Sequence, residues 1–163
     1  MRVLGIDPGT ANCGYGIVQL DGNRLRALAH GTWKTRAGDP PATRLKTIFD
    51  GVAALIAEHE PAAVAIEESF VGVDARTALS VGQARGAVLV AAASVDVPCT
   101  EYAPARVKSA VCGYGRAEKA QVQRMVQSIL RLETRPTPDH ASDALAVAIC
   151  HALAPPLLRA VAG

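Results

Sequence analysis

The sequence predicts an α/β fold in which helices flank a mixed five-stranded sheet. The first part of the chain alternates short apolar runs with turn signals, as antiparallel strands do. Later segments carry apolar residues at three- and four-residue spacing, which indicates amphipathic helices. Residues 63–67 form an apolar run without alternation, as expected for a strand covered on both faces. The 163 residues, 50% of them hydrophobic, suit a single domain over 1–163.

Three strands are expected first. The run 3–6 stops at Asp7-Pro8-Gly9, so Asp7 lies at the C-terminal tip of its strand. A second strand covers 15–20, and the turn signal at 21–23 connects it to a third over 25–35. We expect these strands to form an antiparallel meander.

The remaining elements are mainly helical. Helical spacing of Leu45, Ile48 and Val52 predicts a helix over 41–59. A strand at 63–67, a long helix rich in alanine and glycine at 74–95 and a fifth strand at 99–102 follow. Further helices are expected at 104–111, 117–130 and 138–154.

Two acidic residues end strands that can be neighbours. A right-handed crossover can place 63–67 parallel to 3–6, so that Asp7 and Glu67 project from the same sheet edge. Two carboxylates this close repel each other unless a cation lies between them. Oxygen ligands suit Mg²⁺ or Mn²⁺, so the pair predicts a divalent-metal site.

The last helix supplies two more candidate ligands. His140 and Asp143 are three residues apart and therefore share a helix face. The rest of this helix is nearly all apolar, so these polar side chains need partners, and a metal ion would serve. Asp139 is interpreted as a first-turn acid that complements the helix dipole, and Thr137 as the capping residue.

Each candidate ligand also has a purely structural interpretation. Asp7 could be a turn residue, Glu67 or Glu68 could end a strand at the surface, and His140 could be a satisfied core histidine. The combination of these residues, rather than any one of them, predicts the metal site.

Charge alone says little about a partner, because the formal net charge is only +2. Between positions 104 and 132, however, Glu118 is the only acid among six basic residues: Arg106, Lys108, Arg116, Lys119, Arg124 and Arg131. A basic region beside an acidic metal site suits the cutting of a polyanion. A solvated helix surface is the alternative.

Cysteine usage and the chain start bear on the compartment. Cys13, Cys99, Cys112 and Cys150 lie far apart and are expected to be buried free thiols rather than zinc ligands or disulfides. The start resembles a strand rather than a signal peptide, and no apolar run approaches the ~20 residues of a membrane span. We therefore expect a cytoplasmic protein without a membrane segment.

Five segments resemble the RuvC family of bacterial Holliday-junction resolvases, in the same order and over nearly the whole chain. They are GIDPGTANCGYGIV, AIEESF, GQARG, YGRAEKAQV and HASDALAVAI. The resemblance implies an RNase H-like fold, a homodimer and metal-dependent cutting of four-way DNA junctions. It also implies a branch-migration motor, formed by RuvA and RuvB, as a partner.

The family's four site residues fall on Asp7, Glu67, His140 and Asp143. Many members carry aspartate where this chain has His140, so the ligand type departs there from a common pattern. In two-metal chemistry Asp7 would bridge two ions, Glu67 would hold one, and the other two residues would hold the second or orient water. An imidazole ligand favours Mn²⁺ over Mg²⁺. His140 could instead orient water or phosphate without touching a metal.

The resemblance also implies DNA contacts. Phe70 would contact or unstack bases near the junction centre, while Lys108 and Lys119 would contact the DNA backbone. Arg76 and Arg116 complete the expected DNA-binding residues. The alanine- and glycine-rich helical stretch 78–93 is the candidate dimer interface, with packing on the sheet as its alternative.

Three other functions remain open at this point. A G-I-D-x-G-T segment after a strand also occurs in ATPases of the actin and sugar-kinase type, although those proteins carry two such domains. A junction-binding module without activity and a related RNase H-like nuclease acting on another branched or RNA substrate are the others.

Overall fold

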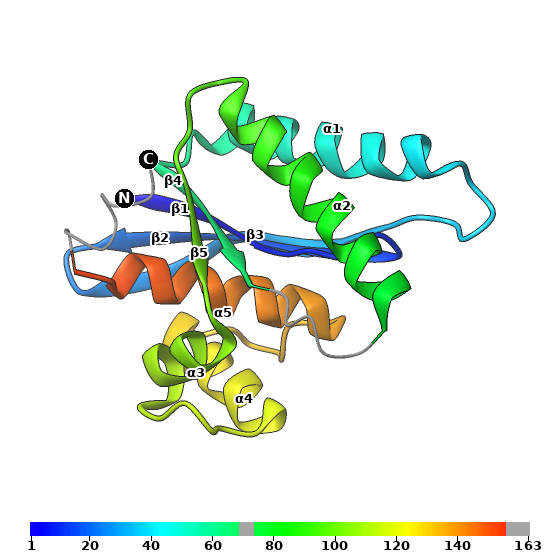
Figure 1. Cartoon of the computed structure of the whole chain (residues 1–163). Helices are drawn as coiled ribbons and strands as arrows, with labels where there is room; N and C mark the ends of the chain where they lie inside the picture. Colours follow the sequence, from blue (N-terminus) through cyan, green and yellow to red (C-terminus); the bar gives the residue numbers. More distant parts are fainter. Residues whose placement is uncertain (69–73, 156–163) are drawn as a thin grey trace.

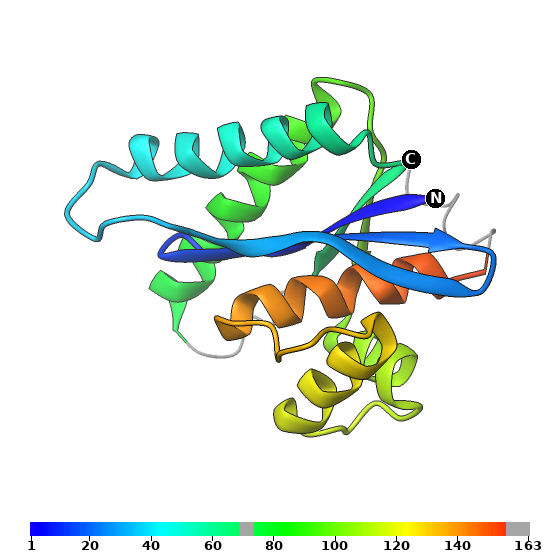
Figure 2. The same cartoon turned by 180° about the vertical axis from the view of Figure 1, so that it is seen from behind.

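The computed structural model describes residues 1–68 and 74–155 (Figures 1 and 2). Five strands form one sheet in the order β3-β2-β1-β4-β5. They are β1 (Arg2–Asp7), β2 (Asn12–Asp21), β3 (Arg24–Lys34), β4 (Ala63–Glu67) and β5 (Cys99–Tyr102). The first three form the antiparallel meander, whereas β4 runs parallel to both β1 and β5. The expected mixed sheet is confirmed.

The described residues form five helices, which are arranged on both sides of this sheet. They are α1 (Pro41–His59), α2 (Ala75–Ala93), α3 (Pro104–Cys112), α4 (Lys119–Leu130) and α5 (Asp139–Leu153). One face packs against α1 and α2, and the other packs against α5. Figure 1 shows α3 and α4 on the far side of α5, which therefore lies between them and the sheet.

The alternation of side chains along the strands decides which residues meet α5. Leu4 and Ile6 of β1 pack in the core formed with α1 and α2, whereas Val3 packs in the core formed with α5. Successive side chains of a strand point to opposite faces. Asp7 therefore shares the α5 face with Val3, and by the same alternation in β4, Glu67 shares that face with Ala65.

Glycines in β1 and β2 allow α5 to lie directly on the sheet backbone. A Cβ atom added to Gly5 would lie 2.0 Å from the carbonyl oxygen of Ala144. A Cβ atom added to Gly14 would lie 2.0 Å from the carbonyl oxygen of His140. Glycine in a strand often marks such a close backbone approach. Asp143 is the only residue of 141–152 that is not buried.

The helix start at α5 corrects one prediction. Its N-cap is Pro138, and no side chain makes a capping hydrogen bond. Thr137 lies one residue outside the cap position, so the expectation that it caps this helix was wrong. Elsewhere β2 extends further than predicted, and α4 begins at Lys119 rather than at 117. In the described part of the chain, no helix combines the length and apolarity needed to cross a membrane.

Gly14→Ala should destabilise the protein by about 1–3 kcal/mol, because overpacking against a backbone carbonyl forces α5 away from β2. Urea unfolding measures the loss. Gly38→Ala is the matched control, since a Cβ atom there meets nothing within 4 Å, and it should stay within about 0.5 kcal/mol of the unsubstituted protein. A Gly14→Ala variant of undiminished stability would contradict the close approach.

Candidate metal centre

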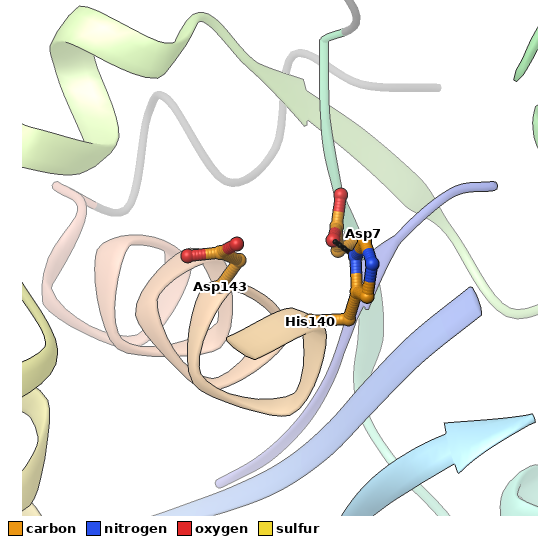
Figure 3. A group of neighbouring side chains, drawn as sticks. All are labelled: Asp7, His140 and Asp143. Carbon is orange, nitrogen blue, oxygen red and sulfur yellow. Dashed lines mark hydrogen bonds and ion pairs between the residues drawn. The ribbon is translucent and has the colours of Figure 1, made fainter. Parts of the chain in front are cut away.

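Asp7, His140 and Asp143 meet where β1 ends and α5 begins (Figure 3). One ligand atom from each residue lies within 4.8 Å of the other two. A hydrogen bond of 2.7 Å joins Nδ1 of His140 to Oδ2 of Asp7. Residues that are 133 positions apart are thus brought into contact by the seating of α5 on the sheet.

Glu67 lies beside this cluster, at the end of the neighbouring strand. Ile6 of β1 pairs with Ile66 of β4, so Asp7 and Glu67 are the next residues along two adjacent parallel strands. Burial, and then the negative charges of Asp7 and Asp143, raise the pKa of Glu67 to about 7. Burial together with the neighbouring negative charge therefore disfavours the ionised form of Glu67, and a cation there would be favourable. The adjacent Glu68 is exposed.

His140 and Asp143 also have raised pKa values. The hydrogen bond to Asp7, followed by the charges of Asp7 and Asp143, raises the pKa of His140. Burial raises the pKa of Asp143, although a hydrogen bond from Lys119 opposes this. Only a neutral imidazole ligates a metal, so binding at His140 would release a proton.

Two lysines lie against the carboxylates. Nζ of Lys119 lies 3.0 Å from Oδ2 of Asp143 and 3.6 Å from Oδ2 of Asp139. A hollow of about 280 Å³ is lined by Lys108 and Lys119 together with Glu67 and Asp143. Both lysines therefore border the carboxylates, and Lys119 is paired with Asp143 and Asp139.

The other predicted DNA-binding residues that the structure describes lie outside this hollow. Arg76 is exposed in the first turn of α2, and Arg116 is exposed shortly before α4. Phe70 lies outside the described residues. The four cysteines are free, as predicted, but Cys99 and Cys112 are only partly buried, so the expectation that all four are buried was wrong for these two.

Sequence reasoning missed two kinds of residue at this site. Gly5 and Gly14 determine how closely α5 approaches, and their signal was glycine inside two apolar strands. Gln123 of α4 donates to Asp139 at 2.9 Å, a contact that no local pattern indicates. Asp139 does lie in the first turn of α5, as predicted.

Comparison with known proteins identifies the family. The family model described as crossover junction endodeoxyribonuclease RuvC matches residues 3–151. This chain belongs to the RuvC family. The RuvC of Heliobacterium modesticaldum is 56% identical over 150 residues, which cover 92% of this chain and 93% of that protein. The RuvC of Desulfitobacterium hafniense is 49% identical over 163 residues, which cover 100% of this chain and 99% of that protein.

Solved structures agree with this assignment. The Thermus thermophilus RuvC structure superposes with a TM-score of 0.88 at 41% identity, covering 93% of each chain. T. thermophilus RuvC in complex with Holliday junction substrate gives a TM-score of 0.90 at 42% identity, again covering 93% of each chain. The yeast mitochondrial Holliday junction resolvase, at 13% identity and a TM-score of 0.66, shares the fold.

These matches decide between the functions left open by the sequence. The predicted RNase H-like fold and the predicted Holliday-junction endonuclease are confirmed. The matches favour a nuclease over the ATPase suggested by the G-I-D-x-G-T segment. The cluster of Asp7, His140 and Asp143 is consistent with a metal site in such a nuclease.

Proposed function

We propose that this chain resolves four-way DNA junctions by metal-dependent phosphodiester hydrolysis at Asp7, Glu67, His140 and Asp143. The observation that carries the proposal is the convergence of three ligand atoms within 4.8 Å, beside the carboxyl of Glu67, whose pKa is raised to about 7. Both core clusters share the one sheet, so we also propose that 1–163 acts as a single domain.

The donor set fits divalent cations. Carboxylate oxygens suit both Mn²⁺ and Mg²⁺. The imidazole nitrogen suits Mn²⁺ better, because Mg²⁺ prefers oxygen ligands. Asp7 belongs to the cluster with His140 and Asp143, and its strand is paired with that of Glu67, so Asp7 is the candidate to be shared by two ions. Two such ions would compensate charge on the phosphate and make an attacking water more acidic.

The chain's own residues would position the DNA. Lys108 and Lys119 line the hollow beside Glu67 and would neutralise backbone phosphates there. Replacing either lysine by alanine should lower the slope of the salt dependence of binding by about one unit, because one phosphate is then no longer neutralised. Arg76 and Arg116 would bind other phosphates of the DNA, and Phe70 would contact bases.

Asp7→Asn should reduce cleavage by more than the roughly 10–100-fold that follows loss of a metal-supporting partner, while junction binding persists. Glu67→Gln should behave alike, because both changes remove metal charge rather than phosphate-binding groups. The measurement is single-turnover cleavage of a four-way junction.

The matched control is Glu68→Gln, since Glu68 is the exposed neighbour of Glu67 and should matter little. A linear duplex and an RNA–DNA hybrid, cut in parallel, separate junction resolution from a related nuclease activity. Cleavage by Asp7→Asn at the rate of the unsubstituted enzyme would eliminate the proposed site.

We further propose that Mn²⁺ supports cleavage better than Mg²⁺ does. The ring nitrogen of His140 adds a ligand that Mn²⁺ accepts more readily, and the site holds one negative charge fewer than with aspartate. Because hydrogen bonding to Asp7 raises the pKa of His140, the competing proton is held more tightly, so metal-supported activity should fall as the pH drops through that raised value.

His140→Asp should therefore narrow the gap between the two metals and weaken this pH dependence. The measurement is junction cleavage against the concentration of each metal, for both proteins. An unchanged Mn²⁺-to-Mg²⁺ ratio in His140→Asp would mean that His140 does not bind the metal.

A homodimer is the proposed assembly, because a four-way junction has near two-fold symmetry and paired cuts need two sites in a fixed relation. The outer face of α2 offers an interface. Leu79 and Val90 are 65% and 60% exposed, and Gly82 and Gly86 lie between them with open space above each. The opposite face, with Ala84 and Val88, packs in the core. The motor of RuvA and RuvB stays a prediction, which co-purification would check.

Val90→Glu should convert the dimer to a monomer, because it replaces an exposed apolar residue of the proposed interface by a charge. Light scattering at micromolar concentration measures the mass. Leu153→Glu is the control, since Leu153 is a similarly exposed apolar residue on α5, at 52%, and should leave the dimer intact. A monomer of the unsubstituted protein at all active concentrations would rule the assembly out.

A further inference from the structure

A second hollow borders the metal cluster and shares no lining residue with the hollow of Lys108 and Lys119. It has a volume of about 600 Å³, which is within the roughly 300–1,000 Å³ typical of ligand sites. Its walls are the loop between β1 and β2 and the first turns of α1 and α2, which lie at one end of the molecule (Figures 1 and 2). His140 also lines it, so the hollow is continuous with the metal cluster.

The lining of this hollow is positively charged. Arg44 and Arg76 line it, and none of its lining residues is acidic. Among the described residues, neither arginine has an ion pair with a carboxylate. A hollow with cations and no acids favours an anion.

Arg44 is held in a fixed position by neutral partners. Its Nε donates to Oγ1 of Thr35 at 2.9 Å, and the Thr35 hydroxyl donates to the carbonyl oxygen of Thr10. A hydrogen bond between the Thr10 and Ser80 hydroxyls connects the same loop to α2. This network uses only Nε of the guanidinium, so its two terminal nitrogens remain as donors suited to phosphate oxygens.

The two hollows border different residues of one turn of α5. His140 lines the hollow of Arg44, and Asp143 lines the hollow of Lys108 and Lys119. A polynucleotide whose scissile phosphate lay at the metal cluster would have neighbouring phosphates on both sides of it. Each hollow would receive one of these neighbouring phosphates.

We propose that the hollow of Arg44 binds the sugar–phosphate backbone of the cleaved strand next to the scissile phosphate, with the terminal nitrogens of Arg44 donating to a phosphate oxygen. The proposal rests on the nuclease function proposed above. It makes Arg44 a substrate-positioning residue that touches a non-reacting phosphate. Preorganised interactions of this kind hold the reacting phosphate in place.

The test replaces single phosphates of the cleaved strand by uncharged methylphosphonates, one position at a time, in a four-way junction. Binding is measured without added metal, so that the DNA stays intact. At one position beside the cut, the unsubstituted protein should lose affinity by roughly 10–100-fold, as expected for a charged hydrogen bond. Arg44→Gln should bind the unmodified junction with affinity reduced by a similar factor. A methylphosphonate at that position should then cause no further loss of affinity.

Two further variants separate binding from structural support. Lys46→Gln removes the same charge two residues away on α1, where Lys46 is exposed and paired with Asp50 at 2.5 Å, and it should keep the position-specific response. Thr35→Val removes the hydroxyl that holds Arg44, and it should weaken the response at the same position only. A structural role for Arg44 would instead lower thermal stability and leave every methylphosphonate response as in the unsubstituted protein.

The outcomes also distinguish this inference from the proposed nuclease function. An unsubstituted protein that neither binds nor cuts four-way junctions would overturn the nuclease function. An unsubstituted protein that cuts them, together with an Arg44→Gln variant that responds to every methylphosphonate as the unsubstituted protein does, would overturn only the role of Arg44.

Discussion

The packing of α5 on the bare backbone of β1 and β2 is the constraint on which the site depends. Side chains at Gly5 and Gly14 would collide with carbonyl oxygens of α5 at 2.0 Å, so only glycine allows the helix to lie this close. The first two turns of α5 then reach the end of β1, where His140 makes its hydrogen bond of 2.7 Å to Asp7. A helix held further away would leave the same residues present but apart.

The same packing concentrates charge that the fold does not neutralise. A carboxyl whose pKa is raised favours the folded state below its ordinary pKa, here 4.5, and this contribution is lost as the pH rises through about 7 for Glu67. Metal-free protein therefore carries an electrostatic cost at neutral pH that the apolar burial of α5 must offset. A divalent cation would remove this cost, so metal affinity and reduced intrinsic stability have one physical origin.

The fold was largely predictable because its signals are local. Alternation, helical spacing and the turn at Gly22 determine nearly all of the elements. Asp7 and Glu67 could be paired because parallel neighbouring strands end at one edge, and the three-residue spacing of His140 and Asp143 placed them on one helix face. Thr137 failed as a cap because Pro138 itself takes that position, a choice that depends on the exact helix start. The position of Arg44 depends on interactions between separate elements, which a single sequence does not display.

The net charge of +2 conceals how cations are distributed in space. Lys46 and Arg85 are paired with Asp50 and Glu101, so they offer little to an approaching polyanion. Arg44 and Arg76 have no carboxylate partner among the described residues, and they line a hollow that opens on the metal cluster. Unpaired cations in a concave surface focus the field there, whereas paired cations on a convex surface are screened. Attraction for a polyanion therefore depends on which cations the fold leaves unpaired beside the site, and the total number of cations is a poor guide to it.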